Sequence, residues 1–517
     1  MSATRILTAI TLAALLFPLG ACDLDVTNPN EPSRERALSN ADDIRSLIRS
    51  QWRVYWAVAQ DDPTDEGSPG AALDATTEII SSNSANDGTW DQGMMPPEAI
   101  INQVGYRWGP WMRDPWLQMN RALAAVRDGL QSIEDRNLDL EDAERIEAFS
   151  KFLQGLFHGY IALMYDRGFI LDETVADPAD VELSSYTAMM QAAMGYLAEA
   201  RSIAAANDFD LPDGWLGPAS YTSDELVRLT HSYQARFMTA VARSPSERDA
   251  VDWDAVMSHV DQGITEDFGV DLDGPGGVWG AYYKGAFGGR GTSLFLPFIG
   301  VADQSGEYIA WENTAANNRM PFEIDTDDRR ITDGTPTGAG VLVEYRSFFS
   351  NQVARGTWFL SNYAPLWHRG IADTGFGFAE EITLQEMAFL KAEAYIRNGM
   401  PAMALDVIND GRVSDGELPE ATVDGVDGAR CVPRAIGPLM KVSGLAEGAC
   451  GDLMTTLAYE KRIELFHLTS GLAFFDARGW GMLRAGRPIH VPIPMEDLQV
   501  LGIPFYTFGG GGEGSAS

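Results

Sequence analysis

The residues of this sequence best suited to a functional role are aromatic side chains that lie among glycines. Their expected role is to bind a ligand. They gather in two stretches without helical periodicity, 61–112 and 262–380. Aromatic faces stack on sugar rings or on peptide side chains, while polar ring edges tolerate water. A loop ring can instead pin its own loop onto the protein body, so only part of the set is expected to face solvent. The predicted ligand-binding residues are Asn86, Asp87, Trp90, Trp108, Trp279, Tyr282, Tyr283 and Trp311.

Catalytic motifs, by contrast, are missing from the sequence. It contains neither the HExxH helix of a zinc protease nor the GxSxG turn of a serine hydrolase. The run 285–292 lacks the Gly-Lys-Ser/Thr ending of a phosphate-binding loop. Paired carboxylates could hydrolyse glycosides, but with 74 acidic residues such pairs occur everywhere and single out no site. We predict a protein that is not an enzyme, with a lipid-anchored surface hydrolase as the alternative.

Two short acidic runs, 271–274 and 424–428, are the only hints of a metal site. They resemble the start of a calcium loop, but neither continues into twelve residues that end in a Glu ligand. Plain acidic turns explain both runs. No cofactor is therefore predicted, and a structural calcium ion remains an alternative.

The charge of the chain excludes whole classes of partner. Its 517 residues include 38 Lys and Arg against 74 Asp and Glu, a formal net charge of −36. Nucleic acid and anionic membrane surfaces are both bound through basic faces, so neither contact is expected. The same charge disfavours a strongly anionic polysaccharide, although a local basic pocket around Lys284 and Arg290 could override it. Hydrophobic residues make up 45% of the chain, enough for a large buried core.

The first residues predict the compartment. Arg5 precedes an apolar run that ends in Leu-Gly-Ala before Cys22, the layout of a secretory signal. That ending resembles the bacterial lipobox, in which the Cys is lipidated after cleavage. We predict a lipoprotein signal peptide over 1–21 and lipidation of Cys22, with an ordinary signal peptide as the alternative. No later stretch of the sequence is apolar enough to span a membrane, so lipid is the predicted anchor.

The remaining cysteines are Cys431 and Cys450. Outside the cytoplasm an even number of cysteines often forms disulfides, so we predict a bridge between these two. Two free buried thiols are the alternative. A zinc site is not expected, because no His or second Cys pair stands at ligand spacing.

Helical periodicity organises most of the chain. It predicts a mostly α fold built from a degenerate set of helical hairpins, one of which, around 392–408, looks tetratricopeptide-like, together with a long irregular stretch over 262–380 that is too long for a simple connector. Residues 41–505 are predicted to form one body, between a tether over 22–40 and a disordered glycine-rich tail over 506–517. The helical repeats are expected at about 41–60, 113–245, 381–412 and 452–468.

Short motifs in order along the chain resemble the SusD/RagB family of surface nutrient-binding lipoproteins. Cys22 is followed by Leu24-Asp25 and then by Asn-Pro-Asn-Glu-Pro-Ser at 28–33, much like that family's mature start. Ser470 stands where the family usually has Glu, and Ala473 and Gly479 stand where Arg is common. We read the C-terminal signature as structural, so the fold is expected to survive these departures. The other residues that carry the resemblance are Trp116, Asn120, Leu123, Ala392, Glu393, Ala394, Asn409, Arg412, Glu460, Arg462, Glu464, Leu465, Gly471, Phe475, Asp476, Arg478, Trp480, Gly481, 490–494 and Glu496.

The resemblance implies a mostly α fold, with a tetratricopeptide-like scaffold of four helical hairpins and a large irregular, loop-rich half that carries the ligand site. It implies a non-catalytic protein that binds glycan or another oligomeric nutrient. It also implies a partner, a TonB-dependent outer-membrane transporter of the SusC type, over which the protein would sit as a lid and hand over oligosaccharide or peptide. The expected location is the outer membrane, lipid-anchored and facing the cell exterior. The family's ligand residues form no transferable motif, so none is carried over. A helical-repeat scaffold that binds only protein is the further alternative.

Overall fold

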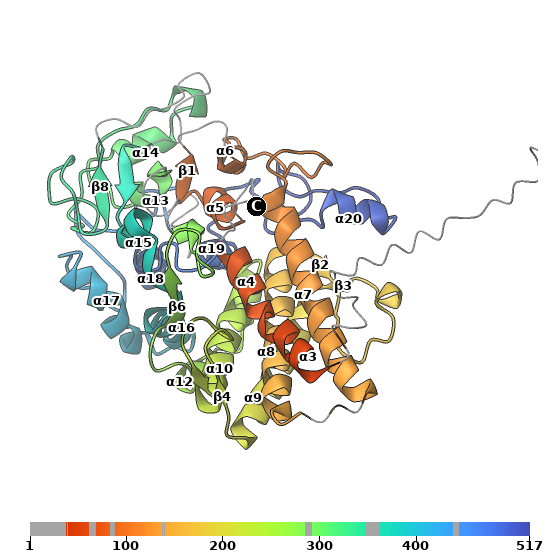
Figure 1. The fold of residues 1–517 in the computed structure, drawn as a ribbon. Helices are drawn as coiled ribbons and strands as arrows, with labels where there is room; N and C mark the ends of the chain where they lie inside the picture. The colour runs from red at the N-terminus through yellow and green to blue at the C-terminus, as the bar shows by residue number, and fades with distance from the viewer. Residues whose placement is uncertain are drawn as a thin grey trace, which may run out of the picture.

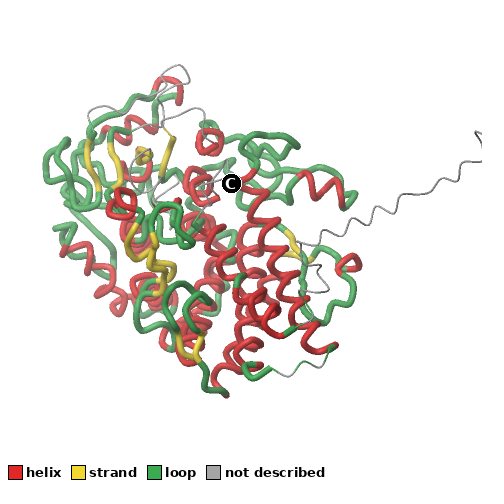
Figure 2. The backbone as a smooth tube through the Cα atoms, in the orientation of Figure 1, coloured by secondary structure: helices red, strands yellow, loops and turns green. Residues whose placement is uncertain are grey.

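The computed structural model describes residues 38, 40–60, 69–82, 88–136, 138, 140–284, 292–346, 361–437 and 444–517. The predicted signal peptide, the lipidation site Cys22 and the candidate ligand residues Asn86 and Asp87 lie outside these residues. The long helices gather on one side of the molecule, whereas most strands lie on the other side among shorter helices and irregular segments (Figure 2).

Helices dominate the described part of the chain, and the mostly α prediction is confirmed. The N-terminal helices are α3 (Ala41–Arg49), α4 (Gln51–Ala59), α5 (Pro69–Thr76), α6 (Gly88–Gly93), α7 (Pro110–Asp135), α8 (Ala143–Met164), α9 (Tyr186–Ala206), α10 (Ser223–Ala240), α11 (Pro245–Asp249) and α12 (Trp253–Asp261). The later helices are α13 (Leu296–Gly300), α14 (Glu307–Glu312), α15 (Arg369–Thr374), α16 (Leu384–Arg397), α17 (Leu405–Ser414), α18 (Leu453–Glu464), α19 (Leu472–Trp480) and α20 (Met495–Val500). Short 3-10 turns are η1 (Pro178–Asp180), η3 (Ala316–Asn318) and η5 (Pro401–Ala404).

Close helix packing builds the scaffold. Helix α8 packs against α7 and α9, and α10 packs against α9, α12 and α16 (Figure 1). The small residues Gly155 and Gly159 on α8 allow this approach. A Cβ at Gly155 would lie 2.6 Å from Leu197 Cγ, and one at Gly159 would overlap the ring of Phe237. Local capping fixes the helix starts, as in α10, where Thr222 and Glu225 form a capping box.

The strands are short and pair across long stretches of sequence. They are β1 (Ile80–Ser82), β2 (Arg167–Gly168), β3 (Ser184–Ser185), β4 (Asp210–Leu211), β5 (Tyr221–Thr222), β6 (Phe268–Asp273), β7 (Thr292–Leu294), β8 (Val343–Tyr345), β9 (Tyr363–Pro365) and β10 (Phe376–Ile382). Each described sheet is an antiparallel pair: β1 with β7, β2 with β3, β4 with β5, β6 with β10 and β8 with β9. The described parts of 262–380 thus consist of short strands, short helices and turns. Their buried apolar side chains belong to the same continuous core as the helices.

Two acidic residues of the C-terminal motif, Glu460 and Asp476, are buried in ion pairs. Glu460 on α18 accepts from Arg330 Nη1 at 2.6 Å and from Arg412 Nη1 at 2.9 Å. On α19, Asp476 lies 2.7 Å from Lys461 Nζ and 3.1 Å from Arg248 Nη2. Buried charges need such partners, because an unpaired one costs several kcal/mol. The contacts join α18 to α17, to the loop-rich half and to α19, and they join α19 to α11, in agreement with a structural role for the motif.

The glycine-rich tail is ordered, and the prediction of disorder over 506–517 was wrong. Phe508 is buried, and the backbone N–H of Gly510 donates to Gly486 O at 2.8 Å. Ala99 and Gly509 form an antiparallel bridge. Glycine at positive φ lets the tail turn tightly enough to make these bonds, which composition alone does not reveal. Among the described residues, no helix has the length and hydropathy needed to cross a membrane.

Candidate ligand-binding site

A two-stranded ribbon on the loop-rich side presents aromatic rings to solvent. Strands β6 and β10 pair so that Phe376 lies opposite Asp273 and Phe378 lies opposite Asp271. Alternate residues of a strand face the same side, so Phe376, Phe378 and Glu380 share the outer face. The residues are 57% exposed at Phe376 and 40% at Phe378. Residues two apart on a strand are roughly 7 Å apart, so an extended oligomer can contact both rings.

The loop after β6 supports this outer face. Asp273 accepts backbone N–H groups from Val278 at 2.8 Å and Trp279 at 2.9 Å, which folds the loop back onto the ribbon. The ring of Phe376 lies so close to Gly274 that a Cβ there would come within 2.5 Å of it. Tyr282, in the same loop, is 44% exposed. The ribbon therefore presents two exposed rings on the same face as Asp271 and Asp273, and the loop after β6 adds the exposed ring of Tyr282.

A cleft of about 590 Å³ opens beside the ribbon. Glu380 of β10 lines it, together with residues from the start of α16, from α17 and from the segment after α18. The rings of Trp367 and Phe466 form its apolar wall, with centroids 4.6 Å apart. The cleft therefore lies between the α16–α17 hairpin and the loop-rich half. Helices α16 and α17 and strand β6 are on the left in Figure 1.

Carboxylates dominate the charge of this cleft. No Lys or Arg is among the described side chains that line it. Arg330 lies behind Glu464, with its Nη1 2.7 Å from Glu464 Oε1, and is itself fully buried. Burial raises the pKa of Glu464, and the guanidinium of Arg330 partly offsets this. The acidic side chains of the lining are Asp267, Glu380, Asp410, Asp415 and Glu464.

His368 lines the cleft and Lys284 lies next to it, but neither adds much positive charge to the cleft surface. Lys284 is fully buried, and its Nζ donates to Leu468 O at 2.7 Å and to His467 O at 3.1 Å. Burial lowers the pKa of Lys284 to about 8. Burial, and then the charge of Lys284, lowers the pKa of His368 well below its ordinary value, so the imidazole is neutral at neutral pH. The suggested basic pocket therefore does not form at Lys284, and Arg290 lies outside the described residues.

Comparison with known proteins identifies the fold. No protein-family model and no curated protein matches the sequence. Solved structures do match. A SusD superfamily protein from Parabacteroides distasonis aligns with a TM-score of 0.56 at 11% identity, over 89% of this chain and 97% of that one. One from Bacteroides thetaiotaomicron aligns with a TM-score of 0.55 at 11% identity, over 89% and 97%.

The chain has the SusD-like fold. A third structure of this fold, from Bacteroides fragilis, aligns with a TM-score of 0.53 at 11% identity, over 86% of this chain and 88% of that one. It is described as a SusD-like carbohydrate binding protein. At these identities the likeness establishes the fold, so the site must be argued from this chain's own residues.

The SusD-like fold buries most of the aromatic residues that the sequence offered for the site. Trp90, Trp279, Tyr283 and Trp311 are all buried. Tyr283 donates its hydroxyl to Asp74 at 2.7 Å, and Trp311 packs on Tyr308 with Arg319 4.1 Å above its ring. These rings pin loops onto the body, as the alternative reading allowed, because a large ring buries more apolar area than any other side chain could there.

Two of the aromatic residues predicted to bind the ligand do reach solvent. Tyr282 belongs to the loop beside the ribbon, and Trp108 is partly exposed beneath the guanidinium of Arg107, 4.4 Å from the ring centroid. Phe376 and Phe378 are the rings that sequence reasoning missed. Their signal was the alternation Gly-Phe-Gly-Phe-Ala-Glu-Glu at 375–381, which is typical of a strand with one exposed face.

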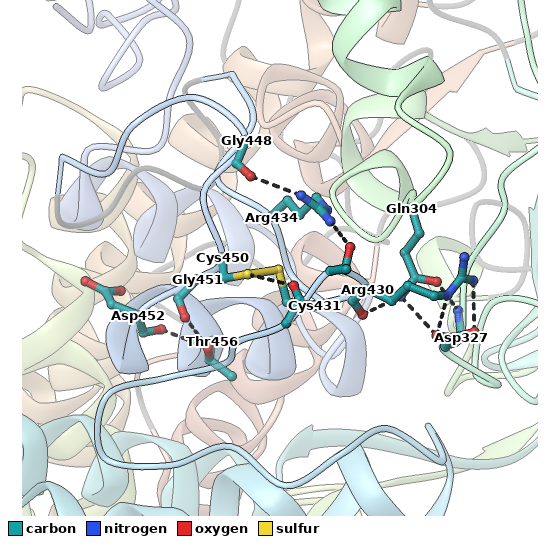
Figure 3. Close-up of a disulfide and its surroundings, with 12 residues drawn as sticks. Gln304, Asp327, Arg430, Cys431, Arg434, Gly448, Cys450, Gly451, Asp452 and Thr456 are labelled. Atoms are coloured by element: carbon teal, nitrogen blue, oxygen red, sulfur yellow. Dashed lines mark hydrogen bonds and ion pairs between the residues drawn. A yellow bond between two sulfur atoms is a disulfide. The ribbon is translucent and has the colours of Figure 1, made fainter.

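The disulfide predicted between Cys431 and Cys450 is confirmed and lies away from the ribbon. Their Cα atoms are 5.7 Å apart, and the bridge joins two segments that pack near Gln304 and Arg434 (Figure 3). Arg434 N–H groups donate to Gly448 O and Ala429 O across this loop. In the described residues, no three His, Cys, Asp or Glu side chains come together as a metal site, and 271–274 instead forms the end of β6 and its turn.

Proposed function

We propose that this protein is a non-catalytic binder of oligosaccharides that acts without a cofactor. The exposed pair of rings on the outer face of the β6–β10 ribbon carries the proposal. Soluble proteins rarely leave neighbouring phenyl rings in water without a partner, and flat rings beside carboxylates suit a sugar, whose faces are apolar and whose edges donate hydrogen bonds. Two structures of the same fold, from Bacteroides fragilis and Bacteroides vulgatus, are described as carbohydrate binding proteins, which supports this assignment.

Isothermal titration against a panel of oligosaccharides and peptides tests the proposal. A double variant, Phe376→Ala with Phe378→Ala, should weaken binding of the best glycan at least tenfold, since each stacked ring contributes roughly 1–3 kcal/mol by analogy with base stacking. The control Phe505→Ala removes a ring that is 51% exposed after α20 and should change nothing. Chromatography should show no shortened product. Binding of peptides alone, or the appearance of cleaved sugar, would contradict the proposal.

We further propose that the protein is held at the outer surface of the outer membrane and passes its ligand to a TonB-dependent transporter of the SusC type. The lipobox-like ending at Cys22 supports the anchor, with 1–21 as the signal peptide and 22–40 as a tether for the body that follows. The SusD-like fold supports the partner by analogy alone. Trp108 and Tyr282 remain proposed ligand contacts, because both reach solvent.

The anchor and the partner can be tested separately. Cys22→Ser should abolish incorporation of radiolabelled fatty acid and release the protein from membranes. Detergent extracts of cells with the native chain should yield a stable complex with a large outer-membrane barrel protein. Retention of the Cys22→Ser chain in membranes would contradict the lipid anchor, and purification of the solubilised native chain alone would contradict the transporter.

A further inference from the structure

The ring face and the cleft form one continuous surface. Glu380 joins them, because it follows Phe376 and Phe378 on the outer face of β10 and also lines the cleft. Gly269 lies opposite Glu380 and adds no side chain between the two. An oligomer that runs along the rings therefore reaches the cleft without leaving the protein surface.

The charged side chains along the surface from the exposed rings to the cleft are negative. Asp271 and Asp273 flank the rings on β6, and the carboxylates of the cleft follow. Asp410 and Asp415 are exposed, and in the described part of the chain neither forms an ion pair. Asp267 accepts the backbone N–H of Leu384 at 2.8 Å and has a further oxygen for a ligand.

Two cationic side chains beside the cleft, those of Arg330 and Lys284, are already bound by other groups of the protein. Arg330 is bound by Asp328, Glu460 and Glu464. Lys284 is buried behind Glu380, with its ammonium 3.5 Å from that carboxylate and bound to backbone carbonyls. Neither can neutralise Asp410 or Asp415, because both are buried away from the surface.

We propose that the ligand is an amino-sugar oligomer with free amines, whose sugar rings stack on Phe376 and Phe378 while its ammonium groups bind the carboxylates of the cleft. This inference rests on the proposed function and names its substrate class. Ammonium donates charge-assisted hydrogen bonds to carboxylate, which are stronger than those of a neutral amide or hydroxyl. A uronate-bearing or sulfated oligomer is repelled by the same carboxylates. Binding therefore ranks by charge: amine first, neutral N-acetyl second and anionic last.

Titration with three oligomers of equal length tests the ranking: hexamers of glucosamine, N-acetylglucosamine and galacturonic acid. At low salt, the glucosamine hexamer should bind at least tenfold more tightly than its N-acetylated counterpart, and 0.5 M salt should remove this preference because it screens the charges. The double variant Asp410→Asn with Asp415→Asn should weaken only the glucosamine hexamer. Asp406→Asn is the matched control, since Asp406 is exposed on the same helix but does not line the cleft.

The outcomes separate this inference from the proposed function. If the N-acetylated hexamer binds as tightly as the glucosamine hexamer, and Phe376→Ala with Phe378→Ala weakens both, the charge preference is wrong and the glycan-binding function stands. The same conclusion follows if only other neutral glycans bind. A preference that survives the Asp410/Asp415 substitutions overturns the role of the cleft. Failure of every glycan to bind overturns both proposals.

Discussion

The carboxylate of Glu393 shows how single residues hold this interior together. It is fully buried on α16 and accepts from Arg248 Nη2 at 2.6 Å, from Arg397 Nε at 2.8 Å and from Trp480 Nε1 at 3.0 Å. Burial alone would raise its pKa, but the guanidinium of Arg248 outweighs this and lowers the pKa to about 2. The folded state therefore holds Glu393 ionised at pH values where the unfolded chain already binds a proton.

This depressed pKa makes the stability depend on pH in a defined window. The stabilisation is fully present above the ordinary value of 4.5 and is lost as pH falls towards 2, by on the order of 3 kcal/mol. Urea unfolding between pH 6 and pH 3 should show this decline, and Glu393→Gln should flatten it although the variant is less stable throughout. The control Glu417→Gln changes an exposed carboxylate and should keep the native profile. An undiminished decline in Glu393→Gln would contradict the assignment.

Residue type alone did not reveal which aromatic side chains reach solvent. Aromatic residues lie among glycines throughout the loop-rich half, but ring size also favours burial, and Trp279 and Trp311 pack inward. Exposure depends on which strand face a residue occupies, and for Phe376 and Phe378 that depends on pairing with β6, about a hundred residues earlier. Local sequence carries the alternation, but the side that faces the core is decided by the distant strand.

At the scale of helices, two glycines give a matched test of close packing. Gly159→Ala should destabilise the protein by about 1–3 kcal/mol, because its Cβ would lie only 2.5 Å from the ring atom Cζ of Phe237 on α10. Gly195→Ala on α9 has open space around the new methyl group and should stabilise by up to about 1 kcal/mol, since alanine favours helix. Chemical denaturation measures both. Equal effects would show that α8 and α10 are not in close contact.

The disulfide also stabilises the fold, and its contribution to the free energy of unfolding follows from the length of the loop that it closes. It closes a loop with a sequence separation of 19, which contributes about 3 kcal/mol in the chain-entropy model. Cys431→Ser with Cys450→Ser should lower the free energy of unfolding by about that amount. Glycan affinity should be unchanged, because the bridge lies outside the ring face and the cleft. Native stability in the double variant, or a loss of affinity without unfolding, would contradict this separation of roles.

Elements were predictable where their signal is local. The periodicity of α8, α10 and α16 lies within each helix, as do the caps formed by Thr222 and Thr383. The strands are two to seven residues long, and β1 pairs with β7 more than two hundred residues away, so no local pattern reveals them. The region 262–380 therefore shows little local pattern in sequence, although its described residues fold as short helices and paired strands.

At the scale of the whole molecule, the C-terminal tail joins distant parts of the chain. Phe508 packs its ring 4.1 Å from that of His490, and its carbonyl accepts the N–H of Ile100 at 3.0 Å. Gly514 accepts the N–H of Ile489 at 2.9 Å. These bonds place the last residues between the N-terminal loop and the segment after α19. The tail thus closes the body rather than extending from it.

Removal of residues 507–517 should therefore destabilise the whole protein. Loss of the buried Phe508 side chain alone costs about 3–5 kcal/mol. The amides of Ile100 and Ile489 would also lose their acceptors, so their hydrogen exchange should accelerate sharply relative to amides in α8. Removal of Ser517 alone is the control, because that residue is exposed and the tail's bonds remain. If the tail were a free appendage, the truncated chain would unfold at the same urea concentration as the native one, and both amides would exchange at unchanged rates.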